Sequence, residues 1–480
     1  MSTALHIKSP KESITIRSIT AALVFLGIFF IPFTSWKGLP FFGEYAKEGC
    51  FAFFALAAII TGVHSVISRK IEIPFRNLLF QLLLILFAWF LISGLINLPT
   101  IRNYFFKGIG GYERFIRQYA VVIISGVVFL ITYYNVFKRY DSLTLFYKVR
   151  RVFYYSMIIV TSYAMLEILI LKFGMSFLYR ILWFYNFFPF TEVKLFYGVN
   201  RISSVTFEAP ALATYLFTVA GWMFSYVITE RGLKRFIPAL VTIALAFFSD
   251  SRAGLIIIFI QIVLFGILLI KKKKHHQLLI KIVFLSVLAL IVVGAYKGKE
   301  IATYIQEKVT SFDVRDSRHS ISNRSRFGIQ YASYKVFQEH PVVGVGYGMQ
   351  AYEGRKKYPK WATVGNWEFR KKYLNENDPR FPPGYNVYTR LMAETGIVGL
   401  AIFILFLTLI LITTFGLIRK NDNRYLLAVV ICISMIGFYF NWLKVDTVRV
   451  FGFWINFALL LRMTSGSTFT LTTKKKNSDI

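Results

Sequence analysis

The sequence has few cysteines and few acidic residues, and both shortages exclude classes of protein. Its two cysteines, Cys50 and Cys432, fall in apolar segments, so no disulfide framework and no cysteine-based zinc site can be built from them. Only 24 acidic residues oppose 56 lysines and arginines, which leaves a formal net charge of +32. Most of these charges flank apolar segments instead of forming one patch, and this distribution argues against a partner that is nucleic acid.

Familiar signatures of cofactor and nucleophile chemistry are also missing. We find no zinc signature, no phosphate-binding loop with a lysine and no nucleophile elbow. The Gly-Val-Gly sequence at 344–346 lacks the strand–turn–helix surroundings of a dinucleotide fingerprint. The four lysines and two histidines at 271–276 are interpreted as a membrane-surface anchor. The sequence therefore predicts no metal ion and no cofactor.

Long apolar runs dominate the sequence instead. Hydrophobic residues make up 56% of the chain and the mean hydropathy is +0.55, values typical of a polytopic integral membrane protein. A spanning helix needs about 20 mainly apolar residues, so the runs predict an all-α fold with about 12 transmembrane helices. No cleavage site follows the first run, which we interpret as a span and not as a signal peptide. The predicted spans are residues 18–34, 48–67, 78–96, 116–134, 152–171, 209–229, 236–249, 253–270, 278–295, 396–418, 425–443 and 449–463.

The connectors between the spans predict the orientation. Lysine and arginine gather in alternate connectors, which is the positive-inside pattern and predicts that both termini are cytoplasmic, with residues 464–480 as a cytoplasmic tail. The seventh span, 236–249, is short for a membrane crossing. The aromatic segment 172–205 is expected to form a helix in the plane of the outer interface. We therefore expect residues 1–295 to form spans one to nine, with this interfacial segment among them.

One long polar segment, residues 296–395, separates the ninth span from the last three spans at 396–463. It is too aromatic to be disordered, and loops of this length are uncommon unless they have a function. We expect a large helical extracytoplasmic loop folded over an active site, and we call residues 296–395 the cap.

Periodicity within the cap predicts a helix from Ser325 to Glu339 that Asn323 caps and Pro341 ends. A tight turn with three glycines follows at 344–348, and a second short helix is expected from about residue 386 to 394.

Arginines gather on the predicted outer side, where a planar guanidinium suits a phosphate group. Arg201, Arg252 and Arg326 are the main candidates for contacting an anionic lipid head group, in particular a diphosphate. Arg324 is a further candidate, although neighbouring helix positions face different ways. Two alternatives stay open: Arg252 pairs with Asp250 or extends to the interface, and Arg201 is an interfacial anchor.

Glu208 precedes Pro210 at the predicted outer start of the sixth span. A carboxylate beside a helix N-terminus stays ionised and can accept a proton from a sugar hydroxyl. The alternative is a helix-end carboxylate, or an ion-pair partner of one arginine. His340 is interpreted either as a catalytic group or as a cation capping a helix C-terminus. Three further polar residues of the cap are candidates for binding sugar or phosphate: Tyr347, Tyr385 and Asn386.

Four motifs follow one another on the predicted outer side. They are Arg201 with Phe-Glu-Ala-Pro at 207–210, Ser-Arg-Ala-Gly at 251–254, Arg326 with His-Pro-Val-Val-Gly-Val-Gly at 340–346, and Tyr-Asn-Val-Tyr at 385–388 before Glu394, Gly396 and Gly399. In this order they resemble the O-antigen polymerase and O-antigen ligase-like proteins of bacterial surface polysaccharide assembly. The resemblance covers about residues 195–415, together with the twelve-span topology.

The resemblance implies a metal-independent, inverting glycosyltransferase of the bacterial inner membrane that acts at the outer face of that membrane. Its substrates would be undecaprenyl-diphosphate-linked glycans, and membrane lipids and a chain-length regulator protein would be its partners. The acceptor hydroxyl would attack the donor's anomeric carbon, with Glu208 as the first choice of base and His340 and Tyr385 as lesser ones. Arg201, Arg252 and Arg326 would stabilise the diphosphate that leaves.

Polymerisation of lipid-linked repeat units is the function that we favour. Many relatives, ligases especially, have His-Asn where this chain has Tyr385 and Asn386, and Ala209 splits the Glu-Pro pair. Transfer of glycan to lipid A-core by a ligase is the first alternative. A lipid-linked oligosaccharide flippase is the second, but transporters place charges deep in several spans, whereas here the charges collect at the outer rim.

Overall fold

The structure is a computed structural model that describes residues 10–68, 71–197, 201–270, 277, 280 and 320–465. Helix accounts for 74% of it, so the all-α prediction is confirmed. The described part contains one pair of strands, β1 (Phe105–Phe106) and β2 (Ile109–Gly110), which pair antiparallel. The predicted ninth span (278–295), the start of the cap (296–319) and most of the tail lie outside the described residues.

The helices follow the apolar runs closely because each run is long enough to bury its backbone in its own hydrogen bonds. The first half contains α1 (Pro10–Phe29), η1 (Pro40–Tyr45), α2 (Gly49–Ser68), α3 (Leu78–Ile96), α4 (Leu98–Ile101), α5 (Gly111–Ile123), η2 (Ile124–Phe129), α6 (Leu130–Phe137), α7 (Ser142–Phe173), η3 (Ser176–Leu178), α8 (Tyr179–Trp183), η4 (Phe184–Phe187), α9 (Ala209–Phe224) and α10 (Tyr226–Thr229). The second half contains η5 (Leu233–Phe236), α11 (Ile237–Phe248), α12 (Arg252–Ile270), α14 (Ser320–Glu339), α15 (Gln350–Gly354), η7 (Arg355–Lys357), α16 (Lys360–Thr363), η8 (Phe369–Tyr373), α17 (Val387–Lys420), α18 (Tyr425–Asn441) and α19 (Phe451–Thr464).

The structure does not confirm the predicted number of twelve spans. Seven helices in the described residues are long and apolar enough to cross a membrane, and three shorter apolar helices accompany them. The predicted seventh span is α11, whose 12 residues extend about 18 Å at 1.5 Å per residue, which is short for a crossing. These helices make the chain a multi-pass membrane protein.

Two local predictions were wrong. Residues 172–205 do not form one interfacial helix: α7 ends at Phe173, Gly174 turns the chain in the left-handed conformation, and three short helices occupy 176–187. The cap helix α14 begins at Ser320, so Asn323 lies inside it, buried, and does not cap it. The short helical segment expected near residue 386 is the first part of α17, which bends at Gly396.

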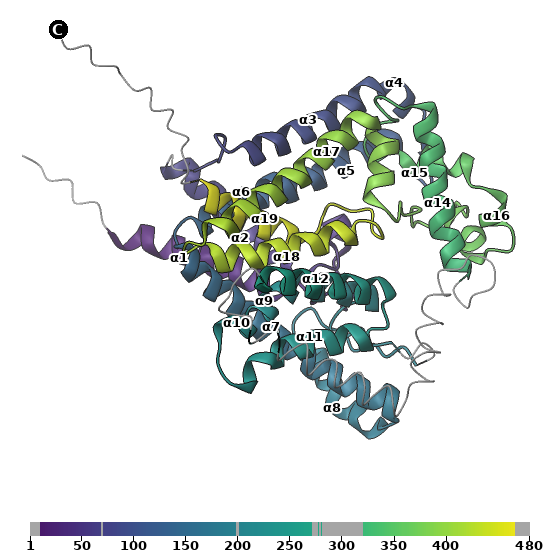
Figure 1. The fold of residues 1–480 in the computed structure, drawn as a ribbon. Helices are drawn as coiled ribbons and strands as arrows, with labels where there is room; N and C mark the ends of the chain where they lie inside the picture. Colours follow the sequence, from purple (N-terminus) through teal and green to yellow (C-terminus); the bar gives the residue numbers. More distant parts are fainter. Residues whose placement is uncertain are drawn as a thin grey trace, which may run out of the picture.

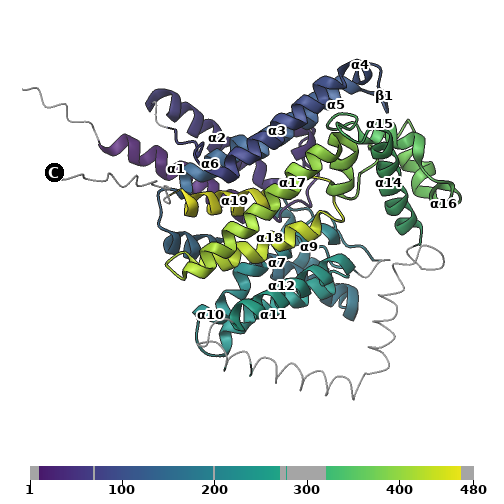
Figure 2. The same cartoon turned by 45° about the horizontal axis from the view of Figure 1, so that its top comes forward.

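Among the seven candidate membrane spans of the described residues, the one that contains α9 is the most buried, and α9 contacts α18, α12, α11 and α7. The cap elements α14, α15 and α16 lie together at one end of the bundle, next to α4 and the start of α17, on the right in Figure 1 and again in Figure 2. The start of α9 and the loop between α18 and α19 belong to the same end of the bundle, because both contribute to one cavity there.

The glycine turn of the cap is docked on the bundle. The backbone N–H groups of Val345 and Gly346 donate to the carbonyl oxygens of Ala393 and Glu394, at 3.1 and 2.9 Å. From α3, the Ser93 hydroxyl donates to the Val343 and Glu394 carbonyls, and Asn97 donates to the Gly344 carbonyl. The glycine motif therefore joins the cap to α3 and α17.

The bend of α17 at Gly396 makes this docking possible. Gly396 has φ = +65°, and a Cβ atom there would lie 2.1 Å from the Val342 carbonyl oxygen. The Ile397 N–H donates to the Pro341 carbonyl at 2.8 Å. A side chain at 396 would therefore clash with the backbone of the cap and would be strained in this conformation.

We expect Gly396→Ala to lower the free energy of unfolding by about 1–3 kcal/mol, because of that strain and clash. The measurement is the apparent melting temperature of the purified protein, followed by tryptophan fluorescence. Gly416→Ala is the matched control, since Gly416 lies in the same helix and a Cβ there would meet nothing within 4 Å. Equal melting temperatures for the two variants would contradict the docking described above.

Candidate active site

The loop from residue 201 to 208 leads into α9 and is held by a buried carboxylate. Glu167, on α7, accepts hydrogen bonds from the backbone N–H groups of Ser203 at 3.0 Å and of Ser204 at 2.8 Å. Ser204 has φ = +52°, and its hydroxyl donates to the Val160 carbonyl. The loop is thus fixed at its centre by the interior of the bundle.

The second half of the same loop is hydrogen-bonded to the segment that follows α1. The N–H groups of Thr34 and Ser35 both donate to the Val205 carbonyl at 3.1 Å, and the Thr34 hydroxyl accepts from Phe207 N–H. Glu208 follows in the N-cap position of α9, but its side chain makes no capping hydrogen bond. Its carboxylate is therefore not used to cap the start of the helix. Pro210 occupies the first turn, as the sequence predicted.

Arg201 begins this loop beside the turn between α11 and α12. Its Nε lies 3.3 Å from Oδ2 of Asp250, and both side chains are about 30% exposed. Asp250 has φ = +51°, which lets the chain reverse between two helices without a longer connector. Arg252 starts α12 and interacts electrostatically with Arg201, Asp250 and Arg326. Arg201 and Arg252, distant in the sequence, therefore face the same region.

The cap supplies the next cation. Arg326, on α14, stacks over the ring of Tyr385 with its guanidinium carbon 5.5 Å from the centroid, and the Tyr385 hydroxyl is hydrogen-bonded to that of Tyr373. Asn386 caps α17 by accepting from Tyr388 N–H at 2.9 Å, and its amide nitrogen lies 3.4 Å from Oε1 of Gln330. Gln330 is one helical turn after Arg326, so the start of α17 meets the face of α14 that carries Arg326.

A fourth cation, Lys444, comes from the loop between α18 and α19. Its Nζ is buried and has no hydrogen-bond partner among the residues that the structure describes. Burial, with Arg326 nearby, lowers the pKa of Lys444 to about 8, while Glu208 opposes this shift. We call Arg201, Arg252, Arg326 and Lys444 the cation cluster.

Glu208 faces the cluster. Although the residue as a whole is exposed, the protein around its carboxylate removes water and raises its pKa; Lys444, Arg326 and Lys47 act in the opposite direction. A carboxyl group of this kind is a better proton acceptor than a fully solvated one and is still ionised above its pKa. Arg326 thus interacts with Arg252 on one side and with Glu208 and Lys444 on the other.

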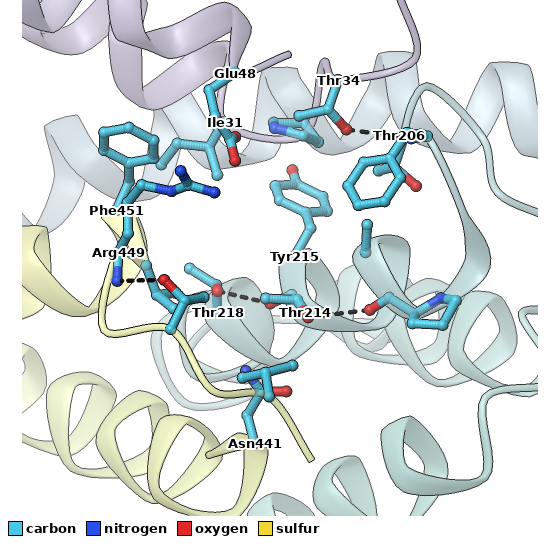
Figure 3. Close-up of a pocket in the computed structure, with 18 of the residues that line it drawn as sticks. Ile31, Thr34, Glu48, Thr206, Thr214, Tyr215, Thr218, Asn441, Arg449 and Phe451 are labelled. Atoms are coloured by element: carbon cyan, nitrogen blue, oxygen red, sulfur yellow. Dashed lines mark hydrogen bonds between the residues drawn. The ribbon is translucent and has the colours of Figure 1, made fainter. Parts of the chain in front are cut away.

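A cavity of about 230 Å³ opens beside Glu208 (Figure 3). Thr214, Tyr215 and Thr218 of α9 form one wall, and Glu48 and Arg449 lie close together at another. The remaining lining comes from the end of α1, the loop before α9, the end of α18 and the segment that leads into α19. Glu208 is therefore one of the residues that line a cavity reaching along α9 as far as Thr218.

Three of the predicted site residues lie away from the cation cluster. Arg324 donates from Nη1 to the Val364 carbonyl, within the cap. Tyr347 is 3% exposed and stacks on Phe90 with centroids 4.5 Å apart, so it is a core residue at the docking surface. His340 follows the other end of α14 from Arg326, about 20 Å along the helix at 1.5 Å per residue. None of these geometries brings the side chain to the cation cluster.

Sequence reasoning missed Lys444, Glu167 and the cavity. One signal for Lys444 was present: it lies with Asp446 and Arg449 in a short connector that the orientation rule places on the same side as the cap. Glu167 is an acidic residue within an otherwise apolar span, which is by default a functional or structural site. The cavity could not be found, since its walls come from four separate parts of the chain.

We expect Glu167→Ala to lower the free energy of unfolding by about 1–3 kcal/mol, because the N–H groups of Ser203 and Ser204 would lose their buried acceptor. Glu167→Gln, which keeps one acceptor oxygen, should lose less. Thermal unfolding of the purified variants measures both. A melting temperature of Glu167→Ala at or above that of Glu167→Gln would show that the carboxylate does not hold the loop.

Comparison with known proteins agrees with this arrangement. Residues 237–404 match a family model described as O-antigen ligase. The matched region includes Arg252, Arg326, Tyr385 and Asn386 but not Arg201, Glu208 or Lys444. No curated protein matches the chain. The match extends over the α11–α12 turn, the described cap and the first part of α17. Residues 237–404 are therefore similar to the O-antigen ligase family, and the chain is consistent with an O-antigen polymerase or ligase-like protein.

Proposed function

We propose that this protein polymerises undecaprenyl-diphosphate-linked oligosaccharide repeat units into surface polysaccharide, at the outer face of the bacterial inner membrane. One observation carries the proposal: Arg326 of the cap interacts electrostatically with Arg252, which also interacts with Arg201, and with Glu208, a carboxylate with a raised pKa that Lys444 faces as well. The matched family supports glycosyl transfer in general.

The cation cluster suits a diphosphate leaving group. Arginine binds phosphate through two parallel N–H groups, and a lysine adds a compact charge. Arg252 is repelled by Arg201 and Arg326, and Lys444 is repelled by Arg326, so positive charge gathers here before a ligand binds. Like charges held together repel, and an anion that binds among them relieves the repulsion. A lipid diphosphate supplies that anion at the membrane surface.

The proposed reaction is a single displacement. Glu208 accepts the proton of the acceptor's hydroxyl group while the hydroxyl oxygen forms a bond to the anomeric carbon of the donor. The bond from that carbon to the phosphate oxygen breaks, and the electron pair leaves with undecaprenyl diphosphate. Attack opposite the leaving group inverts the anomeric centre. Charge that develops on the leaving oxygen is stabilised by the preorganised arginines, which is usually the largest catalytic contribution.

Ligation to lipid A-core is the second candidate, because the matched family is described as O-antigen ligase. Both reactions use the same donor and differ in the acceptor. Tyr385, in the place where many ligases have histidine, stacks on Arg326 and bonds to Tyr373, so it orients the arginine and supplies no imidazole base. This contact favours polymerisation.

We expect Arg326→Ala and Arg252→Ala to lower the rate of chain elongation by roughly 10²–10³, since each removes one preorganised cation. The measurement is the polysaccharide ladder of cells that lack the gene and carry each variant. Arg324→Ala is the matched control: it lies two positions from Arg326 and its Nη1 contacts the cap backbone. Normal ladders with Arg326→Ala, at normal protein levels, would exclude Arg326 from the site.

The ladder also separates the candidate functions. Restoration of long chains by the wild-type gene, with single repeat units present on the surface without it, supports polymerisation. Loss of all surface repeats, with lipid-linked polymer accumulating, would support ligation instead. Repeat units that remain on the cytoplasmic leaflet would overturn the enzyme and favour a flippase.

The pH dependence tests the pairing of Glu208 with Lys444. Activity should rise with pH as Glu208 ionises, and Lys444→Met should move this rise to higher pH, because the lost cation held the pKa of Glu208 down. The measurement is kcat/KM against pH for purified protein with lipid-linked repeat units. Lys335→Met, an α14 lysine that bonds to Gln338, should leave the profile unchanged.

If the rise of kcat/KM with pH were identical in wild type and Lys444→Met, Glu208 would not be the group that titrates. A Glu208→Gln variant that keeps both the rate and this rise would lead to the same conclusion.

A further inference from the structure

The cavity is lined by Glu208, the residue assigned as base, and is separate from the cation cluster in its lining residues. Its volume of about 230 Å³ is below the roughly 300–1,000 Å³ of pockets for drug-sized ligands, so it suits a unit about the size of one sugar ring. Its lining is mostly apolar, with the aromatic residues Phe207, Tyr215 and Phe451, and it also includes hydroxyl, amide and charged groups. Sugars present the same combination of apolar ring faces and hydroxyl edges.

One lining side chain is polar, almost fully buried and incompletely paired. Asn441, the last residue of α18, is 1% exposed, and its Oδ1 has no hydrogen-bond partner among the described residues. Leaving a buried amide oxygen without a hydrogen bond is unfavourable, so its retention at a cavity wall indicates a ligand donor. Asn456 is similarly buried with an unpaired Oδ1, but it does not line the cavity.

Two charged groups, Arg449 and Glu48, also line the cavity and can bind a polar ligand. The Nε of Arg449 is buried without a hydrogen-bond partner in the described part of the chain, while Nη1 binds the Glu44 carbonyl. Glu48 lies beside it in Figure 3, and burial raises the pKa of Glu48, opposed by Arg449. A carboxyl group and a guanidinium facing one cavity are unfavourable surroundings for an acyl chain. They can donate to and accept from the hydroxyl groups of a neutral sugar.

The hydroxyl groups on α9 are arranged as acceptors. Thr214 and Thr218 donate their protons to the carbonyls of Pro210 and Thr214, one turn earlier, and Tyr215 is hydrogen-bonded to Ser156. The lone pairs of these oxygens are therefore available to hydroxyl groups of a ligand.

We propose that this cavity is the acceptor subsite, which holds the non-reducing terminal sugar of the acceptor and directs its hydroxyl toward Glu208. The proposal rests on the proposed function and deepens it. Glu208 lines the cavity and also interacts with Arg326 and Lys444, none of the four cations lines the cavity, and the donor's diphosphate and the acceptor's sugar are therefore assigned to different residues. Asn441 and Arg449 are then positioning residues for the acceptor and take no part in leaving-group stabilisation.

The test uses the full-length protein in lipid nanodiscs, which avoids the sugar head groups of common detergents. The probe is the free oligosaccharide of one repeat unit, released by acid from the polysaccharide of the source strain, and Kd is measured by calorimetry. Asn441→Leu, which preserves volume but removes the amide, should weaken binding at least tenfold. Asn456→Leu is the matched control and should bind as wild type does, and so should Arg252→Ala, because the probe carries no diphosphate.

A second readout separates positioning from a merely structural role. With the free oligosaccharide as acceptor and lipid-linked repeat units as donor, Asn441→Leu should raise the KM for the oligosaccharide at least tenfold and leave kcat within twofold. Asn441→Gln, which keeps the amide, should recover part of the loss. An unchanged Kd and KM in Asn441→Leu, or no binding by wild-type protein that elongates chains, would overturn the subsite.

Failure of the subsite and failure of the proposed function give different results. If the wild-type gene restores long chains and Asn441→Leu is kinetically normal, the subsite is wrong and polymerisation stands. If the wild-type gene restores no long chains, polymerisation is wrong, while a Kd that depends on Asn441 still establishes a sugar-binding cavity.

Discussion

Holding several cations together at the end of an apolar bundle is the constraint on which this structure depends. Arg326 repels both Arg252 and Lys444, and Arg201 also repels Arg252. Proteins retain such unfavourable clusters where function requires them. The surrounding contacts can be understood as the means by which this chain keeps its cations in place without neutralising them all.

Three anchors fulfil that role. The Glu167 carboxylate fixes the loop that begins with Arg201 and ends with Glu208. The cap is fixed by its glycine turn against α3 and the bend of α17, and Asp446, from the Lys444 loop, accepts from the Gly384 N–H of the cap at 2.6 Å. The Nε of Arg390 forms an ion pair with Oε1 of Glu394 at 3.0 Å, and its Nη1 donates to the Asp446 carbonyl at 2.8 Å. The cap and the α18–α19 loop are therefore connected directly, so the groups around Glu208 keep one geometry.

Sequence patterns predicted the all-α fold and most of the long helices, but not the residues that these helices contact. Apolar runs predicted the helices because the bilayer requires every backbone group to be paired within its own segment. Arg201, Arg252 and Arg326 were predicted to act together, and the structure places Arg252 in electrostatic contact with both of the others. Tyr347 was expected to meet a ligand, but its burial depends on Phe90, more than 250 positions away, which periodicity cannot reveal.

The remaining misses have similar physical causes. Lys444 is a single lysine in a short connector, and its significance comes from Arg326 and Glu208, to which no local pattern links it. The cavity is bounded by the end of α1, the start of α9, the end of α18 and the start of α19, so it exists only after the bundle has packed. The start of α14 was predicted wrongly because a polar residue inside a helix and a polar residue at its N-cap have the same local sequence pattern. The helix begins at Ser320, before Asn323.

The most direct test of the account is whether the cation cluster recognises a diphosphate. We would measure the Kd of undecaprenyl diphosphate and of undecaprenyl monophosphate for the purified protein in nanodiscs, with wild type, Arg326→Ala and Arg324→Ala. The account predicts that wild type and Arg324→Ala bind the diphosphate at least tenfold more tightly than the monophosphate, and that Arg326→Ala loses most of this preference. Equal affinities for the two lipids, or a preference that survives in Arg326→Ala, would contradict it.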